Sequence, residues 1–320
     1  MKNVKGSLIL LLTAFIWGSS FVAQTTGSKY IGTFTFNAVR SFVASAFLGI
    51  IILVMQVIKG RTGKSTISSI MEEGLSESVQ TSKWTLKSML GGILCGLVLF
   101  FAMTCQQLGI SLYPEGTAVS GRAGFVTATY VVIVAVIEQF RGRKLHYMIA
   151  LSVLGTIVGM YFLCMSEGIS NIYIGDMVVF LCAIGFTGHI MIVDYFKGLD
   201  SIKLSCVQFL TCGVLSLIVC LLRERIVLGD LRAAIFPILY AGILSSGVAY
   251  TLQMVGQKYA EPAVASIVMS LESVFAVLTG WLVLHEILTG REILGCGLVF
   301  VSVILAQLPQ FFTSKESGKK

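Results

Sequence analysis

The chain alternates long apolar runs with short polar or charged connections. Ten apolar runs cover approximately residues 6–24, 34–58, 88–112, 114–137, 146–165, 175–195, 204–222, 233–257, 262–284 and 292–310. A bilayer core about 30 Å thick is crossed by roughly 20 residues of helix. The runs lack the period-two alternation of a transmembrane barrel, and an open sheet would leave its edge groups unsatisfied in lipid. The pattern therefore predicts an all-α membrane protein with ten transmembrane helices.

The composition agrees with a membrane protein. Hydrophobic residues make up 56% of the 320 residues and charged residues 12%, against roughly 45–50% and about 25% in soluble domains. This balance excludes a soluble enzyme, a disordered chain and a nucleic-acid-binding domain, although the formal net charge is +7. The eight cysteines lie inside or beside apolar runs, without a CxxC pair or metal-ligand spacing. We therefore expect the lipid bilayer as a partner, no nucleic acid, no cofactor and no metal.

The distribution of Lys and Arg predicts the orientation in the membrane. With the N-terminus inside, sixteen of them fall in inner segments and five in outer segments. The outer five are Lys29, Arg223, Arg225, Arg232 and Arg291. The positive-inside rule then places both termini in the cytoplasm, as a multi-pass protein of the cell membrane.

The longest connection, residues 59–87, is polar and Ser-rich, which is typical of a cytoplasmic loop. It contains the stretch GRTGKST. Only two residues separate the glycines of this stretch, where a phosphate loop has four, and a membrane helix precedes it instead of a strand. Nucleotide binding is therefore not predicted.

Two halves of the chain show internal similarity. At an offset of 148, residues 114–143 match residues 262–291 at a proline that starts a run and at a Glu followed five residues later by Arg. The matched pairs are Pro114/Pro262, Val126/Val274, Ala128/Ala276, Glu138/Glu286, Gly142/Gly290 and Arg143/Arg291. At an offset of 169, the first run matches the sixth at Gly6/Gly175, Leu12/Leu181 and Ala14/Ala183. Because each half holds an odd number of spans, the two five-helix repeats are expected to insert in opposite orientations.

Several motifs resemble one family of membrane transporters. The stretch Ala14-Phe15-Ile16-Trp17-Gly18-Ser19-Ser20-Phe21, the stretch 123–132 (AGFVTATYVV), the stretch 247–253 (GVAYTLQ) and the paired Glu138 and Glu286 resemble EamA-type members of the drug/metabolite transporter superfamily. The resemblance implies ten helices as two inverted repeats and transport by alternating access. It divides the chain into a first repeat, 1–165, that includes the loop 59–87, a second repeat, 166–311, and a short basic tail, 312–320.

Charged residues inside apolar runs are candidate functional residues, because a charge at the bilayer centre costs roughly 2.5–3.5 kcal/mol on the insertion scale. Arg122 and Glu272 lie at similar distances from the matched prolines, so they are expected at similar depth, where they could pair directly. The alternatives are a structural ion pair and a solute or proton site. Arg40 lies in the first third of its run, close enough to the outer end to snorkel to the interface.

Neutral polar residues add to this candidate site. Gln253 belongs to a polar stripe of the eighth run and Tyr250 lies beside it, and both can hydrogen-bond either a ligand or a neighbouring helix. His189 can relay protons or serve as a neutral packing residue. The predicted substrate-binding set is Arg122, Glu272, Tyr250, Gln253 and His189. Glu138 and Glu286 are expected to pair with the arginines at their helix ends, Arg143 and Arg291.

These features favour a secondary transporter of small polar or amphipathic metabolites, and the family resemblance suggests an exporter of amino acids or related compounds. Opposite charges at one site suit a zwitterion, and protons are a candidate coupling ion. A non-transporting receptor or scaffold is the main alternative. An intramembrane enzyme is disfavoured because HExxH, GxSxG and GxGD patterns are absent from the sequence. The oligomeric state and the identity of the solute do not follow from the sequence.

Overall fold

The computed structural model describes residues 2–62, 85–114, 117, 119–142, 147–164, 173–285 and 290–317. These residues form helices and the turns between them, and they contain no strand. In chain order the helices are α1 Lys2–Gly27, α2 Thr33–Thr62, α4 Leu86–Ser111, α5 Val119–Ala128, α6 Tyr130–Phe140, α7 Tyr147–Cys164, α8 Ile174–Tyr195, α9 Ser201–Arg223, α10 Leu228–Ala233, α11 Ile235–Leu239, η1 Tyr240–Ala249, α12 Tyr250–Gly256, α13 Pro262–Met269, α14 Glu272–Leu284 and α15 Gly290–Ser317.

The all-helical membrane fold predicted from the apolar runs is confirmed. Eight helical segments of the described chain are long and apolar enough to cross a bilayer. The fifth and tenth predicted spans correspond to α7 and α15, which are helical but have shorter apolar stretches, at Tyr147–Gly159 and Ile293–Leu305. The total of ten membrane crossings therefore stays a prediction.

The fourth predicted span begins later than expected. Its apolar run starts at Pro114, but residues 114 and 117 are not helical and α5 begins at Val119. The apolar run therefore includes both a non-helical connection and the helix after it. Its first residue, Pro114, did not mark the helix start, because proline occurs in loops as well as in the first turn of a helix. The consequence for Arg122 is that it lies in the first turn of α5.

Three of the spans are interrupted helices. α5 and α6 meet at Thr129, whose hydroxyl donates to the carbonyl of Val126 at 2.6 Å. α13 and α14 meet beside Ser270, whose hydroxyl donates to the carbonyl of Ile267 at 2.7 Å. Hydroxyl groups that bond to the preceding turn compete with the backbone ladder and bend helices. The third interrupted span is α11, η1 and α12, in which η1 is a π-helix of 10 residues.

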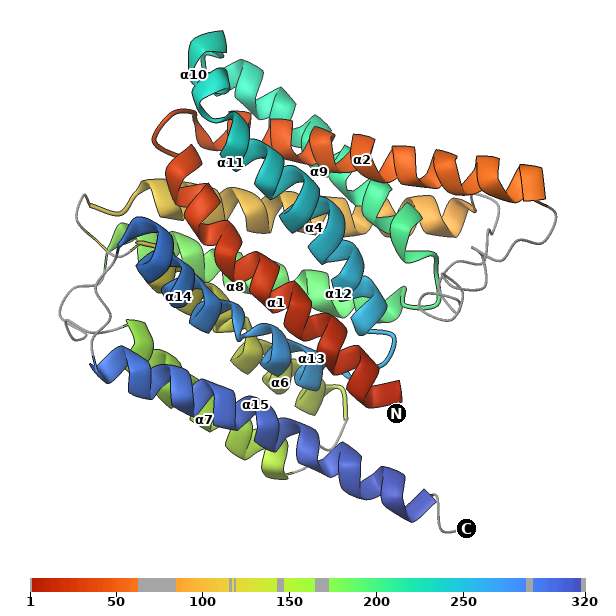
Figure 1. Cartoon of the computed structure of the whole chain (residues 1–320), viewed down its shortest axis with the longest axis vertical. Coiled ribbons are helices and arrows are strands. Elements are labelled where there is room, and N and C mark those ends of the chain that lie inside the picture. Colours follow the sequence, from red (N-terminus) through yellow and green to blue (C-terminus); the bar gives the residue numbers. More distant parts are fainter. Residues whose placement is uncertain are drawn as a thin grey trace.

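Helices of the two halves pack against each other (Figure 1). α1 contacts α14, α12 and η1, while α8 contacts α5 and α4. α2 packs on α9, and α7 packs on α15. The N- and C-terminal ends of the chain lie at the same end of the bundle in Figure 1, whereas α10 lies at the opposite end.

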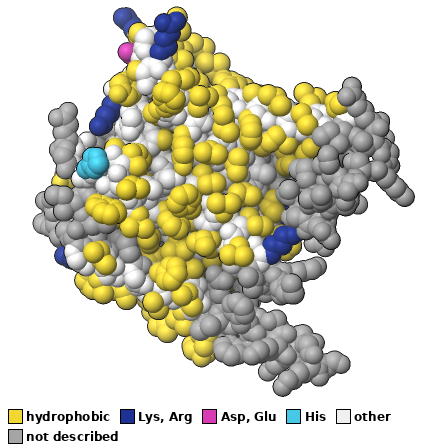
Figure 2. All heavy atoms as spheres, in the orientation of Figure 1, with side chains coloured by type: hydrophobic (Ala, Val, Ile, Leu, Met, Phe, Trp, Pro, Cys, Tyr) yellow, Lys and Arg dark blue, Asp and Glu magenta, His cyan; other side chains and the backbone are white. Residues whose placement is uncertain are grey.

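The outer surface of the bundle is apolar, as lipid contact requires. Figure 2 shows hydrophobic side chains over most of the described face. Large side chains that point outward include Leu8, Ile50, Leu53, Leu154 and Phe300, which are all more than half exposed. Polar side chains are instead buried between the helices, which is the reverse of a soluble protein.

Candidate functional site

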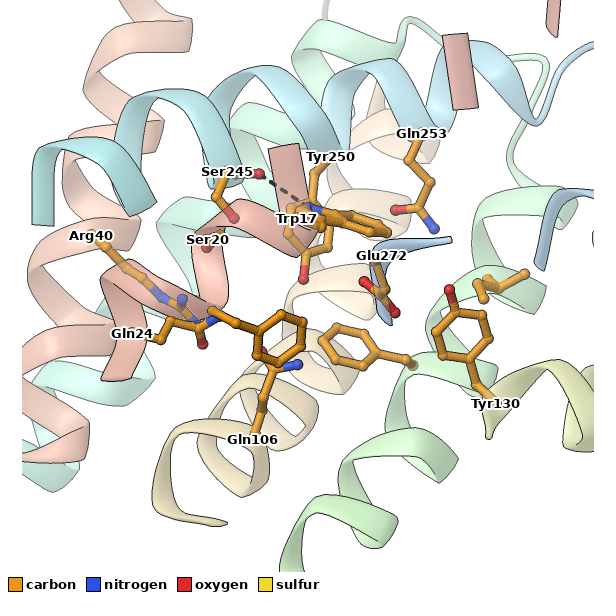
Figure 3. A pocket seen from close by; sticks show the side chains of 13 residues that line it. Trp17, Ser20, Gln24, Arg40, Gln106, Tyr130, Ser245, Tyr250, Gln253 and Glu272 are labelled. Carbon is orange, nitrogen blue, oxygen red and sulfur yellow. Dashed lines mark hydrogen bonds between the residues drawn. The ribbon is translucent and has the colours of Figure 1, made fainter. Parts of the chain in front are cut away.

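A small polar pocket lies between the helices (Figure 3). Its unfilled volume is about 30 Å³. The lining comes from both halves of the chain and consists of Trp17, Ser20, Phe21, Gln24, Arg40, Gln106, Tyr130, Phe186, Ile190, Ser245, Tyr250, Gln253 and Glu272. Because one water needs roughly 10–15 Å³ of such space, the pocket in this conformation has room for about two waters.

Two opposite charges line this pocket. Arg40 comes from α2 and Glu272 from the start of α14, and each residue is only 3% exposed. Figure 3 shows Arg40 beside Gln24, whereas Glu272 lies toward Tyr130. The guanidinium of Arg40 lies 5.3 Å from the centre of the Phe36 ring. Among the described residues, Arg40 and Glu272 form no ion pair with each other.

Several buried polar atoms of the lining have no hydrogen-bond partner within the described chain. They are Ser20 Oγ, Gln24 Oε1, Arg40 Nε, Tyr130 Oη, Gln253 Oε1 and Glu272 Oε1. Leaving such a group unpaired costs about 1–3 kcal/mol, so buried polar groups in proteins almost always have partners. The lining therefore offers donors and acceptors that water or a solute must satisfy.

Aromatic rings hold Tyr250 in place within the lining. Its ring centre lies 4.7 Å from that of Trp17, 5.3 Å from that of Phe209 and 5.6 Å from that of His189. The indole N–H of Trp17 donates to the carbonyl of Ser245 at 3.3 Å, which fixes the Trp17 ring against η1. Tyr250 thus has little freedom to turn away from the pocket.

The structure brings three of the five predicted site residues together. Glu272, Tyr250 and Gln253 line the pocket. His189 is fully buried outside the lining, where its Nε2 lies 3.0 Å from Gln208 Oε1 and its ring contacts Tyr250. His189 therefore supports the lining from behind.

Arg122 is not part of the pocket lining and does not pair with Glu272. Its Nε donates to Asp176 Oδ1 at 2.8 Å and its Nη2 donates to Asp176 Oδ2 at 2.7 Å. A direct pair with Glu272, one of the possibilities considered, is not formed, because the comparison counts depth from Pro114, whereas Pro114 is not helical and α5 begins at Val119. Arg122 thus lies near the end of its span, and Glu272 lies near the middle of the span formed by α13 and α14.

The sequence pattern did not single out Asp176, and it placed Arg40 at the membrane interface. Asp176 is an acidic residue inside the sixth apolar run, and this position could have indicated that its carboxylate binds a buried basic residue. Arg40 is instead buried and faces the pocket. α2 begins at Thr33, so Arg40 lies within the helix and not at its end. The Glu138 carboxylate pairs with Arg141 at 3.2 Å. Its expected partner Arg143, like the symmetry-related Glu286, lies outside the described residues.

A bundle of membrane helices around a buried, charged pocket is the architecture of a solute transporter. The chain belongs to the EamA-like transporter family, whose model matches residues 4–165 and 173–308. It is 28% identical over 311 residues to an uncharacterized transporter of Archaeoglobus fulgidus, covering 96% of this chain and 87% of the relative. It is 21% identical over 308 residues to the uncharacterized transporter YoaV of Bacillus subtilis, covering 94% and 96%.

The fold is also similar to that of a solved crystal structure. The TM-score is 0.70 at 17% sequence identity, and the likeness covers 95% of this chain and 96% of the other. The protein is therefore a multi-pass membrane transporter of this family.

Proposed function

We propose that the protein is a secondary transporter that exports small zwitterionic metabolites, amino acids or related compounds, by alternating access. The observation that carries this proposal is the pocket in which Arg40 and Glu272 are buried without forming an ion pair. Two opposite charges held apart in a low-dielectric site are complementary to a solute that carries both a carboxylate and an amine.

Each group of the pocket has a role in this proposal. Arg40 binds the carboxylate of the solute, because a guanidinium offers paired donors that match a carboxylate. Glu272 binds the ammonium group and takes up a proton when the solute has left. Tyr250 and Gln253 bind the remaining polar parts. Arg122 and His189 act from outside the pocket, through Asp176 and Tyr250 respectively.

Alternating access fits the small volume of the pocket. A solute of amino-acid size cannot enter about 30 Å³, so the helices must separate before it binds. We propose ten spans arranged as two inverted five-helix repeats, since rocking of one half against the other then opens the pocket to one side at a time.

Exchange in liposomes tests the proposal. Purified protein in sealed liposomes loaded with unlabelled amino acids should accumulate labelled amino acids by counterflow. Arg40→Gln and Glu272→Gln should each lower the exchange rate by about tenfold or more, because hydrogen bonds to charged groups contribute roughly 1.5–3 kcal/mol. Lys29→Gln, which changes an exposed cation, is the matched control and should exchange like the parent.

Two outcomes would contradict the proposal. If the parent protein exchanges no amino acid or other metabolite released by cells, the non-transporting scaffold is the better hypothesis. If Arg40→Gln and Glu272→Gln both exchange at the parent rate, the solute binds elsewhere. Comparison of metabolites released by cells with and without the protein tests the direction of transport.

A further inference from the structure

Asp176 joins three helices at one end of the bundle. Its carboxylate accepts two hydrogen bonds from Arg122, at 2.8 and 2.7 Å, and one from the Tyr113 hydroxyl at 2.8 Å. The backbone N–H of Tyr173 donates to Oδ2 at 2.8 Å, and the Arg122 guanidinium lies 4.6 Å from the Tyr173 ring centre. Tyr113 follows α4, Arg122 lies in α5, and Asp176 is in the first turn of α8.

These helices also cross closely at this end. A Cβ atom added to Gly175 would lie 2.9 Å from the carbonyl oxygen of Gly109, so α8 and α4 touch through glycine backbones. Tyr113 belongs to the same apolar cluster as Phe21, which lines the pocket. The Asp176 contacts therefore adjoin an apolar cluster that reaches the pocket at Phe21.

The other end of the bundle has the corresponding crossing. Gly6 matches Gly175 in the repeat, and a Cβ added to Gly6 would lie 2.7 Å from Tyr259 Cβ and 3.3 Å from the carbonyl oxygen of Gly256. α1 thus approaches the end of α12 as α8 approaches the end of α4. Both ends of the bundle thus have a close helix crossing at a glycine.

The two ends differ in the residues that could hold them closed. At the repeat offset of 169, which also relates Gly175 to Gly6, Asp176 corresponds to Ser7. Serine carries no charge, so the position equivalent to Asp176 at the other end cannot form the ion pair that Asp176 forms with Arg122.

We propose that Asp176 and Arg122 form a latch that holds closed the end of the pocket where α4, α5 and α8 meet. The latch makes the empty protein open preferentially at the other end, where Ser7 takes the position of Asp176. Asp176 is thus a positioning residue that sets the balance between the two access states. This inference rests on the alternating access of the proposed function.

Opening at this end must break the latch. Separation of α8 from α4 and α5 withdraws the carboxylate from the guanidinium and from the Tyr113 hydroxyl at the same time. Removal of one partner of a buried ion pair leaves the other charge unpaired, which favours conformations that admit water. A neutral residue at position 176 or 122 should therefore shift the population toward the state that is open at this end.

Distances between spin labels test the latch without any solute. In a background without native cysteines, Ser111→Cys and Met177→Cys place labels on exposed positions at the latch end. Leu8→Cys and Glu261→Cys place labels on exposed positions at the other end. In Asp176→Asn and Arg122→Gln, the ratio of long to short distances at the latch end should rise by about tenfold or more. The ratio at the other end should stay the same or fall.

Two further variants keep the test decisive if the neutral variants fold poorly. Tyr113→Phe removes a single hydrogen bond to Asp176 and should give a smaller shift in the same direction. Arg141→Gln breaks the ion pair with Glu138 away from the latch and should leave both distance distributions unchanged.

Unchanged distances at the latch end in folded Asp176→Asn, Arg122→Gln and Tyr113→Phe would overturn the latch, as would equal broadening at both ends. A shift confined to the latch end in a protein that exchanges no solute would support the latch and refute the proposed function. Amino-acid exchange without a shift at the latch end would support the proposed function and overturn the latch.

Discussion

Individual charges inside the bundle separate into two kinds. Arg122 is neutralised by Asp176, with which it forms two short hydrogen bonds. Arg40 and Glu272 each have a buried polar atom without a partner among the described residues. Because a buried ionisable group without an ion-pair partner is costly, the second kind is the stronger indication of a ligand site. Arg40 and Glu272, which form no ion pair with each other, therefore indicate the ligand site better than the Arg122–Asp176 pair does.

Glu272 is predicted to couple transport to protons. If its carboxylate exchanges a proton for the ammonium group of the solute, liposomes with an acidic lumen should take up solute against its gradient, because protons leave as solute enters. Glu272→Gln cannot take up the proton and should lose this accumulation. Time courses of labelled amino-acid uptake with and without the pH gradient measure the effect.

The control for this prediction is Glu272→Asp, which keeps the carboxylate and should keep a response to the gradient. Accumulation by Glu272→Gln at the parent level would show that the proton is carried by another group. Uptake driven by an acidic exterior would show that solute and proton move in the same direction, which contradicts exchange at Glu272.

At the scale of elements, the apolar runs predicted where helices lie but not where they break. An apolar run shows only that its side chains favour transfer into lipid and contains no information on breaks in the backbone hydrogen bonding. The breaks at Thr129 and Ser270 depend on which carbonyl a hydroxyl group bonds, and the π-helix η1 depends on packing against α1 and α2. The same limit misplaced Arg122, since the start of α5 cannot be read from hydrophobicity. Glu272, Tyr250 and Gln253 could be predicted because polar side chains in apolar runs must face inward.

The crossing of α1 and α14 is expected to tolerate only glycine at position 18. A Cβ at Gly18 would lie 2.6 Å from the carbonyl oxygen of Glu272 and would also overlap Phe275 Cβ. Gly18→Ala should therefore push α14 away from α1, with a loss of roughly 1–3 kcal/mol from overpacking that exceeds the gain of about 1 kcal/mol in helix propensity. The loss of stability is measured by heating the purified protein and using gel filtration to determine the fraction that stays folded at each temperature.

Gly49→Ala is the matched control for this crossing. A Cβ at Gly49 has no neighbour within 4 Å, so this change should leave stability unchanged or raise it slightly. Equal stability of Gly18→Ala and the parent protein would mean that the crossing adapts at no cost. Displacement of Glu272 should also lower amino-acid exchange in Gly18→Ala but not in Gly49→Ala.

At the scale of the whole molecule, the two ends of the bundle differ in charge and in chain ends. Both termini lie at one end in Figure 1, together with the turn between α12 and α13. The opposite end carries the exposed residues Arg223, Arg225 and Arg232 around α10, which has no buried residue. Figure 2 shows cationic side chains grouped at that end. This local cluster opposes the overall excess of Lys and Arg on the side of the termini, and the larger total is expected to decide the orientation.

The predicted orientation places both termini in the cytoplasm and α10 outside. In a background without native cysteines, Asp230→Cys in α10 should react with a membrane-impermeant maleimide in intact cells, because position 230 is exposed at the outer end. Glu261→Cys, which is exposed in the turn before α13, should react only after the membrane is permeabilised. Since the two positions lie on connections at opposite ends of one span, they form an internal control for each other. Reaction of Glu261→Cys alone in intact cells would reverse the orientation, and it would mean that the arginines around α10 outweigh the larger number of cations at the other end.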